Sequence, residues 1–169
     1  MPLRLRPPRP ADEEAFRAAQ ARLAAEGHAF GLRLEPGMAW EDYLRLLDDQ
    51  RAGRNLPAQF VPSTFLVADI GDVIVGRSSI RHHLNDRLMR VGGHIGYAVL
   101  PEYRRRGYAT EILRQSLIIV RSLGVERVLV TCDEDNVGSM RAIEACGGTL
   151  ENIERSVPGE PGLRRYWID

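Results

Sequence analysis

Residues 101–113 read PEYRRRGYATEIL, in which three arginines run into a glycine and a helix-forming segment follows. Pro101 interrupts the apolar run before it, so the stretch predicts a strand, a turn and then a helix. The first backbone N–H groups of a helix lack internal partners and carry partial positive charge. Three like charges are unfavourable there unless solvent screens them or an anion binds, so the turn is a candidate anion site.

The side chains of this turn suit a phosphate ligand. Gly107 has no side chain, so a ligand can approach the backbone closely, and Ala109 is small enough to leave that approach open. Thr110 can add a hydroxyl donor. The residues that could neutralise a pyrophosphate are Arg104, Arg105 and Arg106. A tight turn that needs a glycine and is flanked by solvated arginines explains the same residues, so both interpretations stay open at this point.

The composition limits the classes of function. The 169 residues suit one domain with one core, spanning residues 1–169, and 44 % hydrophobic and 27 % charged residues are typical of a soluble protein. The formal net charge is zero, with 23 basic and 23 acidic residues, and every basic residue is an arginine. Proteins that coat nucleic acids usually carry a net basic surface, so we expect no nucleic-acid partner and a local anion site.

Cysteine usage and hydropathy give further expectations. Cys132 and Cys146 fit no metal-binding spacing and are too few for a disulfide scaffold, so we expect buried free thiols and no metal. No apolar run approaches the ~18 residues that a membrane-spanning helix needs. The N-terminus, MPLRLRPPRP, lacks the apolar stretch of a signal peptide, which predicts a cytoplasmic protein without membrane contact.

Hydrophobic periodicity predicts an ordered series of helices and strands. Two amphipathic helices, at 11–27 and 38–53, precede a hairpin formed by 63–70 and 73–84, a polar connection and a strand at 94–100. The remaining predicted elements are a short strand at 3–6, a helix at 109–124, a strand at 125–132, a helix at 137–148 and a closing hairpin of 149–157 and 163–168. This order predicts an α+β fold with a central mixed, mostly antiparallel sheet flanked by helices.

Two familiar phosphate-binding motifs are missing. The chain has no G-x-x-x-x-G-K-[ST] sequence, and its lack of lysine excludes a P-loop in its usual form. It also has no G-x-G-x-x-G after a strand, so a dinucleotide site of the Rossmann type is not expected.

The segment GYAVLPEYRRRGYATEIL, residues 96–113, resembles the central motif of the GNAT family of N-acetyltransferases. The family signature is a strand, then [RQ]-x-x-G-x-[GA], then a helix, and Arg104, Gly107 and Ala109 meet it here. The resemblance implies a GNAT acyl-CoA N-acyltransferase fold with acetyl-CoA as cosubstrate. It further implies that the turn holds the pyrophosphate through backbone N–H groups and that the preceding strand pairs with the pantetheine arm.

A second motif agrees with the first. Family members carry an asparagine at the start of a helix that ends in Gly-Phe; here Asn136 opens the helix and Gly147-Gly148 ends it, with glycine in place of phenylalanine. The spacing of Asn136 and Ser139 is most similar to the branch that contains ribosomal-protein N-terminal acetyltransferases, and the preceding residues resemble uncharacterised predicted acetyltransferases. The matching stretches cover roughly residues 94–148. The resemblance implies cofactor contacts at Ala98, Val99, Leu100, Arg104, Arg105, Arg106, Gly107, Tyr108, Ala109, Thr110, Asn136 and Ser139.

Acetylation requires a neutral amine, and a nearby base can take its proton. His94, on the strand before the turn, is the candidate catalytic base because histidine titrates near neutral pH, with a hydrogen-bonded structural histidine as the alternative. His82 and His83 end an adjacent strand, and Glu102 lies beside the turn as a more solvated option. Alternation divides 94–100 between two faces, and either set can face the substrate.

The general acid that would protonate the leaving thiolate is less clearly indicated than the base. A thiol pKa of about 8.5 makes the thiolate a tolerable leaving group without one. Many family members have a tyrosine seven residues after the asparagine, but that position is Ile143 here. Similarity to the ribosomal branch makes Ser139 the candidate catalytic acid, with a packed helix serine as the alternative. Asn136 can bind the pantetheine arm, cap the helix or do both.

The acceptor pocket is expected to form from residues 28–60 and 82–93, because the N-terminal helices and the sheet edges shape it in the family. The candidate substrate contacts are Arg81, His82, Asn85 and Tyr97. Trp40 and Tyr43 fall in the same region, but positions in the core stripe of a helix explain them as well.

These patterns favour an enzyme that moves an acetyl group from acetyl-CoA to a primary amine, on a small molecule or a protein, by direct attack in a ternary complex. Ile143 leaves a second interpretation, an acyl-CoA-sensing domain with reduced catalysis. A nucleotide- or RNA-binding protein is a third, which zero net charge disfavours. Dimers are frequent in the family, so a homodimer is compatible with the resemblance.

Overall fold

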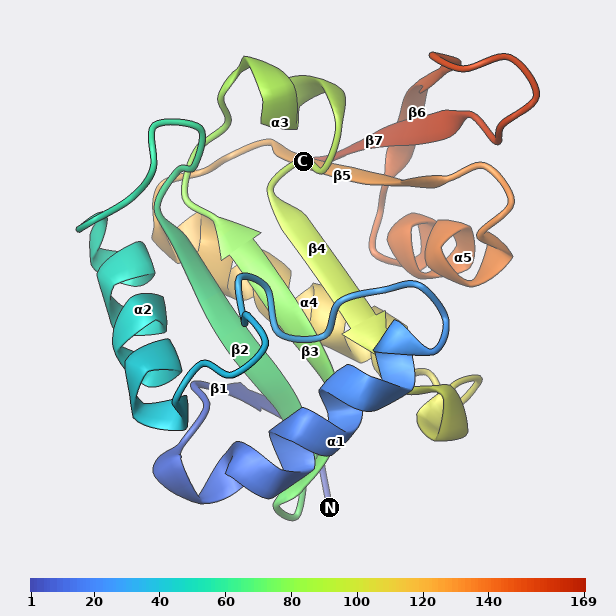
Figure 1. The fold of residues 1–169 in the computed structure, drawn as a ribbon. Coiled ribbons are helices and arrows are strands. Elements are labelled where there is room, and N and C mark those ends of the chain that lie inside the picture. Colours follow the sequence, from blue (N-terminus) through green and yellow to red (C-terminus); the bar gives the residue numbers. More distant parts are fainter.

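The computed structural model describes residues 1–169 and divides the strands between two sheets, with helices on both faces of the larger one (Figure 1). The strands are β1 (Arg4–Arg6), β2 (Ser63–Ile70), β3 (Val73–Arg81), β4 (Ile95–Val99), β5 (Val128–Asp133), β6 (Thr149–Glu154) and β7 (Leu163–Ile168). The helices are α1 (Glu13–Ala24), α2 (Trp40–Ala52), α3 (Asp86–Arg90), α4 (Tyr108–Ser122) and α5 (Val137–Ala145), with single 3-10 turns at Pro10–Asp12 and Pro101–Tyr103. The predicted α+β fold is confirmed.

The two sheets meet only at the start of β4. The larger sheet has the order β1-β2-β3-β4, the smaller has the order β5-β7-β6, and every pairing within them is antiparallel. An isolated bridge joins Gly93 to Val130, and the His94 N–H donates to the Leu129 carbonyl at 2.7 Å. Beyond this point β4 and β5 make no ladder. A gap therefore separates them, which the sequence pattern did not predict.

The helices cover the larger sheet on both sides. Figure 1 shows α1 and α2 in front of this sheet and α4 behind it. Apolar residues at helical spacing supply the buried face of each of these helices, although Leu44 is only half-buried and Ala24 and Leu123 are exposed at the helix ends. The buried stripe residues are Phe16, Ala19 and Leu23 of α1, Trp40, Tyr43 and Leu47 of α2, and Ile112, Leu113, Leu117 and Val120 of α4.

Aromatic side chains fill the space between α1, α2 and the sheet. The Phe16 ring lies 4.9 Å from Trp40, 5.0 Å from Phe30 and 5.6 Å from Tyr43, in tilted or edge-on arrangements. Such pairs each add about 0.5–1.5 kcal/mol to the stability that burial provides. The Tyr43 hydroxyl donates to the Leu32 carbonyl at 3.0 Å. Trp40 and Tyr43 are therefore core residues that fix the front helices.

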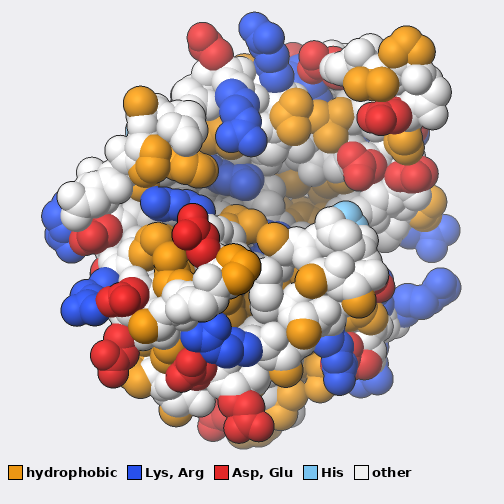
Figure 2. Space-filling view, viewed as in Figure 1, with side chains coloured by type: hydrophobic (Ala, Val, Ile, Leu, Met, Phe, Trp, Pro, Cys, Tyr) orange, Lys and Arg blue, Asp and Glu red, His pale blue; other side chains and the backbone are white.

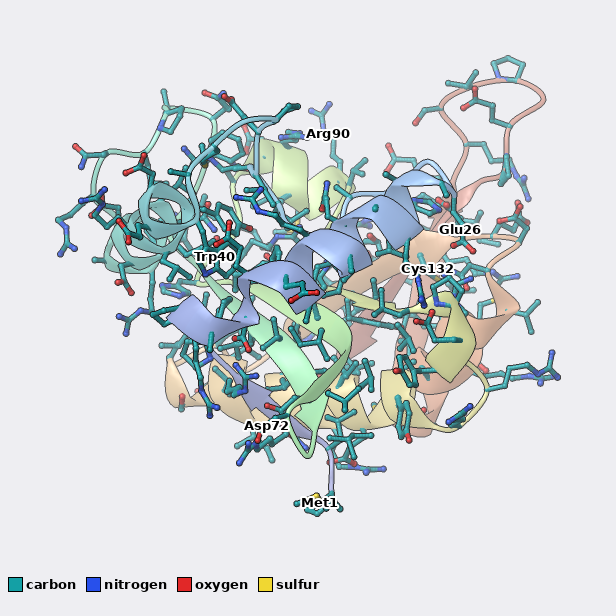
Figure 3. All side chains as sticks on the ribbon, turned by 60° about the horizontal axis from the view of Figure 1, so that its bottom comes forward. Met1, Glu26, Trp40, Asp72, Arg90 and Cys132 are labelled. Carbon is teal, nitrogen blue, oxygen red and sulfur yellow. The ribbon has the colours of Figure 1, made fainter.

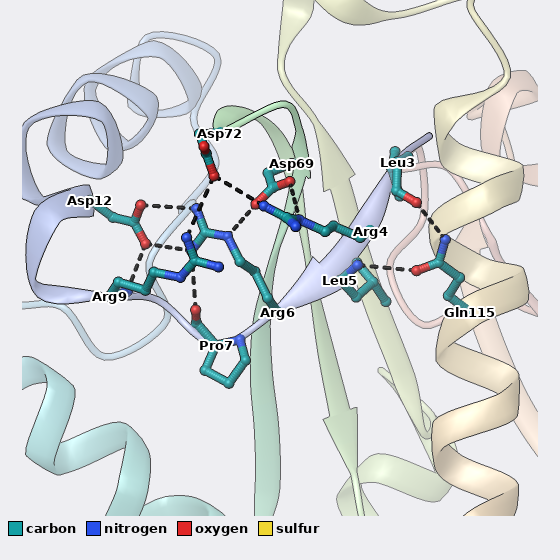
Figure 4. A network of polar contacts seen from close by, with 10 residues as sticks. All are labelled: Leu3, Arg4, Leu5, Arg6, Pro7, Arg9, Asp12, Asp69, Asp72 and Gln115. Atoms are coloured by element: carbon teal, nitrogen blue, oxygen red, sulfur yellow. Dashed lines mark hydrogen bonds and ion pairs between the residues drawn. The ribbon is translucent and has the colours of Figure 1, made fainter. Parts of the chain in front are cut away.

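A polar network anchors the N-terminal strand (Figure 4). The buried Arg6 guanidinium donates to Asp12 at 2.7 and 3.0 Å and also to Asp69, whose side chain is fully buried. Arg4 donates to Asp69 at 2.9 Å and to Asp72 at 3.0 Å. These bonds tie β1 to the start of α1 and to the β2–β3 hairpin, so that α1 is held firmly across the sheet.

Residues 85–93, predicted as a polar connection, contain the short helix α3. Asn85 caps it by accepting a hydrogen bond from the Leu88 N–H at 2.9 Å. A five-residue helix offers too few turns to show hydrophobic periodicity, so the pattern could not reveal it. No helix of the protein combines the length and the apolar character needed to cross a bilayer.

Candidate active site

A cavity of about 1030 Å³ lies between β4, α5 and the turn that joins β4 to α4, and the end of α1 closes its other side. Figure 2 shows this face hollowed between the part that carries β6 and β7 and the part that carries α1. The predicted site residues that line the cavity are Tyr97, Ala98, Val99, Arg104, Arg105, Gly107, Tyr108, Ala109, Thr110, Asn136 and Ser139. Those outside its lining are Arg81, His82, Asn85, His94, Leu100 and Arg106.

The turn before α4 presents a row of free backbone donors. The amide N–H groups of residues 105–110 have no backbone or side-chain acceptor, whereas the Glu111 N–H already bonds to the Gly107 carbonyl at 3.2 Å. Arg105 has φ +62° and Gly107 has φ +80°, so the chain alternates with the left-handed region. Successive amides in this arrangement converge on a concave site that favours an anion.

The space in front of the turn is open. A Cβ built on Gly107 would meet no atom within 4 Å, so the glycine is not required by packing within the chain. Its positive φ strains other residues, and a side chain would project into the space that a phosphate needs. The unpartnered amides and the open approach together fit a pyrophosphate group.

The three arginines of the turn are not equivalent. Arg104 donates to both carboxylate oxygens of Glu26, at 3.1 and 2.6 Å, and to the Val99 carbonyl at 3.1 Å. Glu26 lies at the C-terminal end of α1, as Figure 3 shows, and the hydrogen bond from Arg104 lowers its pKa. Arg106 turns outward to the Glu102 carbonyl. Arg105 alone lines the cavity without a protein partner.

One further basic residue of the cavity, Arg141 of α5, was missed by sequence reasoning. It makes no hydrogen bond or ion pair with the rest of the chain and lies among the residues that line the cavity. The helical spacing could have identified Arg141, because residues at i, i+3, i+4 and i+7 lie on one face of a helix. The members of this face of α5 that line the cavity are Gly138, Arg141, Ala142 and Ala145.

The free edge of β4 offers backbone donors to the gap. The Leu100 N–H bonds to Val75 and the Arg81 N–H bonds to the His94 carbonyl, both across the β3–β4 ladder. Because alternate residues of an antiparallel strand bond to the same neighbour, Gly96 and Ala98 also face β3. The backbone groups of Tyr97 and Val99 consequently face the gap.

Tyr97 and Ser139, predicted for different roles, are brought together across this gap. The Tyr97 hydroxyl lies 2.8 Å from the Ser139 Oγ, and either group can donate. Burial raises the pKa of Tyr97 to about 12, so its hydroxyl keeps its proton at neutral pH. The pair is a proton-bearing group on the wall of the cavity, which spacing alone could not reveal.

Asn136 caps α5 and lines the cavity at the same time. Its Oδ1 accepts a hydrogen bond from the Ser139 N–H at 3.0 Å, as an N-cap residue does. The amide nitrogen of its side chain has no partner within the protein and remains available to a ligand.

His94 lies outside the cavity, at the seam between the sheets. Its Nδ1 accepts a hydrogen bond from the Leu129 N–H at 2.9 Å, and the residue is 6 % exposed. Burial, aided by the charge of Arg81, lowers its pKa to about 4. These contacts favour a structural role, because protonation of Nδ1 would break the bond that joins β4 to β5.

The predicted substrate contacts on β3 and beyond it have local partners. Arg81 donates to the carbonyls of Gly92 and Gly93 at 3.1 and 3.4 Å. His82 shares a hydrogen bond of 2.8 Å with Thr64, and burial lowers its pKa. The cavity is lined instead by His28, Ala29 and Leu32, which lie within the stretch 28–60 expected to shape the pocket, and by Arg77 of β3, which was not expected there.

The cysteines form no disulfide, and no cluster of histidine, cysteine and acidic residues is suited to hold a metal ion. Cys132 is buried and Cys146 is half-buried. Burial raises the pKa of Cys132 to about 11, which keeps its thiol protonated. Neither residue lines the cavity.

Comparison with known proteins agrees with this geometry. The family described as "Acetyltransferase (GNAT) domain" matches residues 2–149. No curated protein matches the sequence.

Solved structures share the fold. RimJ of Mycobacterium smegmatis, in complex with CoA-disulfide, is 22 % identical, with a TM-score of 0.68 and coverage of 98 % of this chain and 81 % of that one. The protein yncA of Salmonella typhimurium, solved with its cofactor acetyl-CoA, is 15 % identical, with a TM-score of 0.65 and coverage of 99 % of this chain and 93 % of that one. The ribosomal-protein-S5-alanine acetyltransferase of Vibrio fischeri is also 15 % identical, with a TM-score of 0.65 and coverage of 98 % and 91 %. The chain therefore belongs to the GNAT family of acetyl-CoA-dependent acetyltransferases, as its strand–turn–helix motif predicted.

Proposed function

We propose that the protein transfers an acetyl group from acetyl-CoA to a primary amine by direct attack in a ternary complex. Bound acetyl-CoA supplies the acetyl group as a thioester: the C–N bond forms as the C–S bond breaks, a base takes the amine proton and CoA leaves as the thiol. The observation that carries the proposal is the row of unpartnered amides at residues 105–110, which opens into a cavity of about 1030 Å³.

The phosphate end of the cofactor is assigned to the turn. The free amides bind the pyrophosphate, and Gly107 leaves room for it. Arg105 and Arg141 add the charge, because both line the cavity without a carboxylate partner. Arg104 acts instead as a positioning residue, since its bonds to Glu26 and Val99 fix the turn against α1.

The free edge of β4 positions the reacting end. The N–H groups of Tyr97 and Val99 face the gap and can pair with the pantetheine arm or with the thioester oxygen as it gains charge. Asn136 can bind the arm from the other side of the gap through its free amide nitrogen.

Two protons have to move. We assign the proton that reaches the leaving sulfur to the Tyr97–Ser139 pair, which lines the cavity and stays protonated. A lysine-like amine with a pKa of ~10.4 must lose a proton before it attacks, which costs about 4.6 kcal/mol at pH 7. His28 is the histidine that lines the cavity and is our candidate base, in preference to His94 at the seam.

One observation favours a second candidate function, an acyl-CoA-sensing domain. Ile143 occupies the position where many family members carry the acidic tyrosine, and it is fully buried in the core. If the Tyr97–Ser139 pair does not replace that tyrosine, the protein would bind CoA without efficient turnover.

Calorimetry and thiol release separate these candidates. Titration with CoA and with ATP should show tight binding of CoA alone, and thiol release from acetyl-CoA should rise on addition of a reactive amine. Binding of CoA without turnover across a wide amine panel would favour the sensing function. Equal binding of ATP and CoA would contradict both.

A further inference from the structure

Arg77 of β3 is a half-buried cation without an anionic partner. Its Nη2 donates to the Ala29 carbonyl at 3.2 Å, and its Nε is buried and has no hydrogen-bond partner within the protein. The side chain lines the cavity, on the side where the α1–α2 connection crosses the sheet. A guanidinium has five N–H donors and its buried ones normally have acceptors, so Arg77 has donors to spare.

No carboxylate of the protein serves this arginine. Glu26 is the only acidic residue that lines the cavity, and Arg104 already binds both of its oxygens. Burial and the nearby charge of Arg81 lower the pKa of Arg77 to about 10, so it remains a cation at neutral pH. A bound anion would offset the cost of keeping that charge away from water.

The position of Arg77 relates it to the reacting end of the cavity. It pairs with Ala98 in the β3–β4 ladder, between the two residues whose backbone groups face the gap. Directly opposite residues of antiparallel strands have Cα atoms about 4.5–5.5 Å apart. Arg77 and Ala98 line the same cavity, and Arg77 reaches the Ala29 carbonyl, so an anion held by Arg77 lies in that cavity on the face of the sheet that α1 covers.

The α1–α2 connection limits the size of what binds there. Figure 1 shows this connection passing in front of β3 and β4. The Gln20 side chain holds it in place by accepting from the N–H groups of Phe30 and Gly31 at 3.0 and 2.6 Å, and the Phe30 ring is fully buried. A wall pinned in this way closes one side of the cavity, which favours a small acceptor over an extended polypeptide.

We propose that Arg77 binds a carboxylate of the acceptor, so that the acceptor is a small amino acid whose primary amine is acetylated. This inference rests on the proposed function. The planar guanidinium matches a carboxylate with paired hydrogen bonds, which also orient the amine at the other end of the molecule. Arg77 is thus a residue that determines acceptor specificity.

The test compares amino acids with their carboxamides, which keep the amine and lose the negative charge. For wild-type protein, kcat/KM should favour the amino acid of the best pair by about 30-fold or more, since truncating one partner of an enclosed charge pair has an effect of that size. Arg77→Gln should lose that preference, with little change for the carboxamide. Arg77→Lys should restore part of it.

The control variant is Arg33→Gln. Arg33 lies in the same α1–α2 connection, where it bonds to Gln50 at 3.1 Å and does not line the cavity. Arg33→Gln removes the same charge from outside the cavity, so the preference of the enzyme for the amino acid over its carboxamide should persist. Affinity for CoA, measured by calorimetry, should be unchanged in all variants and shows that they are folded.

A binding experiment tests the same inference without relying on turnover. The best amino acid, titrated into CoA-saturated protein, should bind to wild-type protein and to Arg33→Gln but not to Arg77→Gln. A preference that survives in Arg77→Gln, or equal use of carboxamides by wild-type protein, would overturn the inference and leave acetyl transfer intact. A fall in CoA affinity in Arg77→Gln would also overturn it, because the arginine would then serve the cofactor. Arg77-dependent binding without turnover would support the carboxylate site and contradict acetyl transfer. If the protein neither bound nor acetylated any amino acid, the carboxylate site and acetyl transfer would both be overturned.

Discussion

Arg6 is a buried arginine and Arg77 a half-buried arginine of the same four-stranded sheet, and their surroundings differ. Arg6 bonds to Asp12 at 2.7 and 3.0 Å and to the buried Asp69. The hydrogen bond to Asp12 raises its pKa, although burial acts to lower it. Arg77 has no carboxylate, and burial together with the charge of Arg81 lowers its pKa to about 10.

The difference distinguishes a region that stabilises the fold, around Arg6, from a region that can bind a ligand, around Arg77. Where every enclosed donor has its acceptor, the bonds hold elements of the fold together, as at the start of β1. Where donors are left unpaired, as at Arg77 and the amides of 105–110, the fold keeps groups that a ligand can satisfy. Changes in the paired region should therefore alter stability, and changes in the unpaired region should alter binding.

The largest effect is expected in the paired region. Asp69→Ala leaves Arg6 enclosed with one carboxylate fewer and should lower the free energy of unfolding by about 3–5 kcal/mol. Chemical denaturation measures the change. Asp72→Asn is the control, because the Asp72 side chain is 72 % exposed and asparagine tolerates its φ of +67°, so the loss of charge should cost less than about 1 kcal/mol. Similar losses for the two variants, or a large loss of CoA affinity in Asp69→Ala, would break the comparison.

His94 should make stability depend on pH. Its folded-state pKa of about 4 lies below the ordinary 6.5, so the unfolded chain takes up the proton first. Its contribution is complete above pH 6.5 and is lost as the pH falls toward 4, by about 3 kcal/mol in total.

His94→Asn is the matched variant for this pH effect. Its side-chain oxygen can still accept from the Leu129 N–H but does not titrate, so unfolding curves should lack this slope. A variant with unchanged stability and CoA affinity but greatly reduced turnover would instead support His94 as the base.

Gly107→Glu should weaken CoA binding about 100-fold, or about 2.7 kcal/mol, because a charged side chain enters the phosphate site. Calorimetry measures the affinity. Gly124→Glu is a close control: Gly124 follows the other end of α4, has φ +90° and also faces open space. It introduces similar backbone strain and the same charge, and should leave CoA affinity unchanged. Equal losses in the two variants would assign the effect to strain.

The smallest effect is expected at the Tyr97–Ser139 pair. Tyr97→Phe should lower kcat about 10-fold, or about 1.4 kcal/mol, with CoA affinity preserved, because a thiolate leaves tolerably without an acid. Ser139→Ala should have a similar effect, and the double variant should be no worse than either alone. Strictly additive losses would show that the two hydroxyls do not act together.

Much of the fold was predictable because its elements carry local signals. A pattern within a few residues of sequence predicts the apolar stripe of α1, and another predicts the Gly71-Asp72 turn of the β2–β3 hairpin. The gap between β4 and β5 carries no such signal. The gap depends on the contact between His94 and Leu129, which joins segments far apart in the chain.

The turn between β4 and α4 was predictable for the same reason, since its motif is contiguous. The cavity wall around Arg77 was not, because it assembles from segments distant in sequence. Arg77 sits in a strand that looks like any half-buried strand, and only the tertiary structure reveals that no carboxylate approaches it. The engagement of Arg104 with Glu26 likewise depends on where α1 ends in space.

The most direct test of the central claim is a titration of ¹⁵N-labelled protein with CoA, followed by NMR. Binding of the diphosphate by the free amides should give the largest shifts, and slowed hydrogen exchange, at residues 105–110. Saturation of the protein with CoA while these amide signals stay in place, and signals elsewhere move, would contradict it.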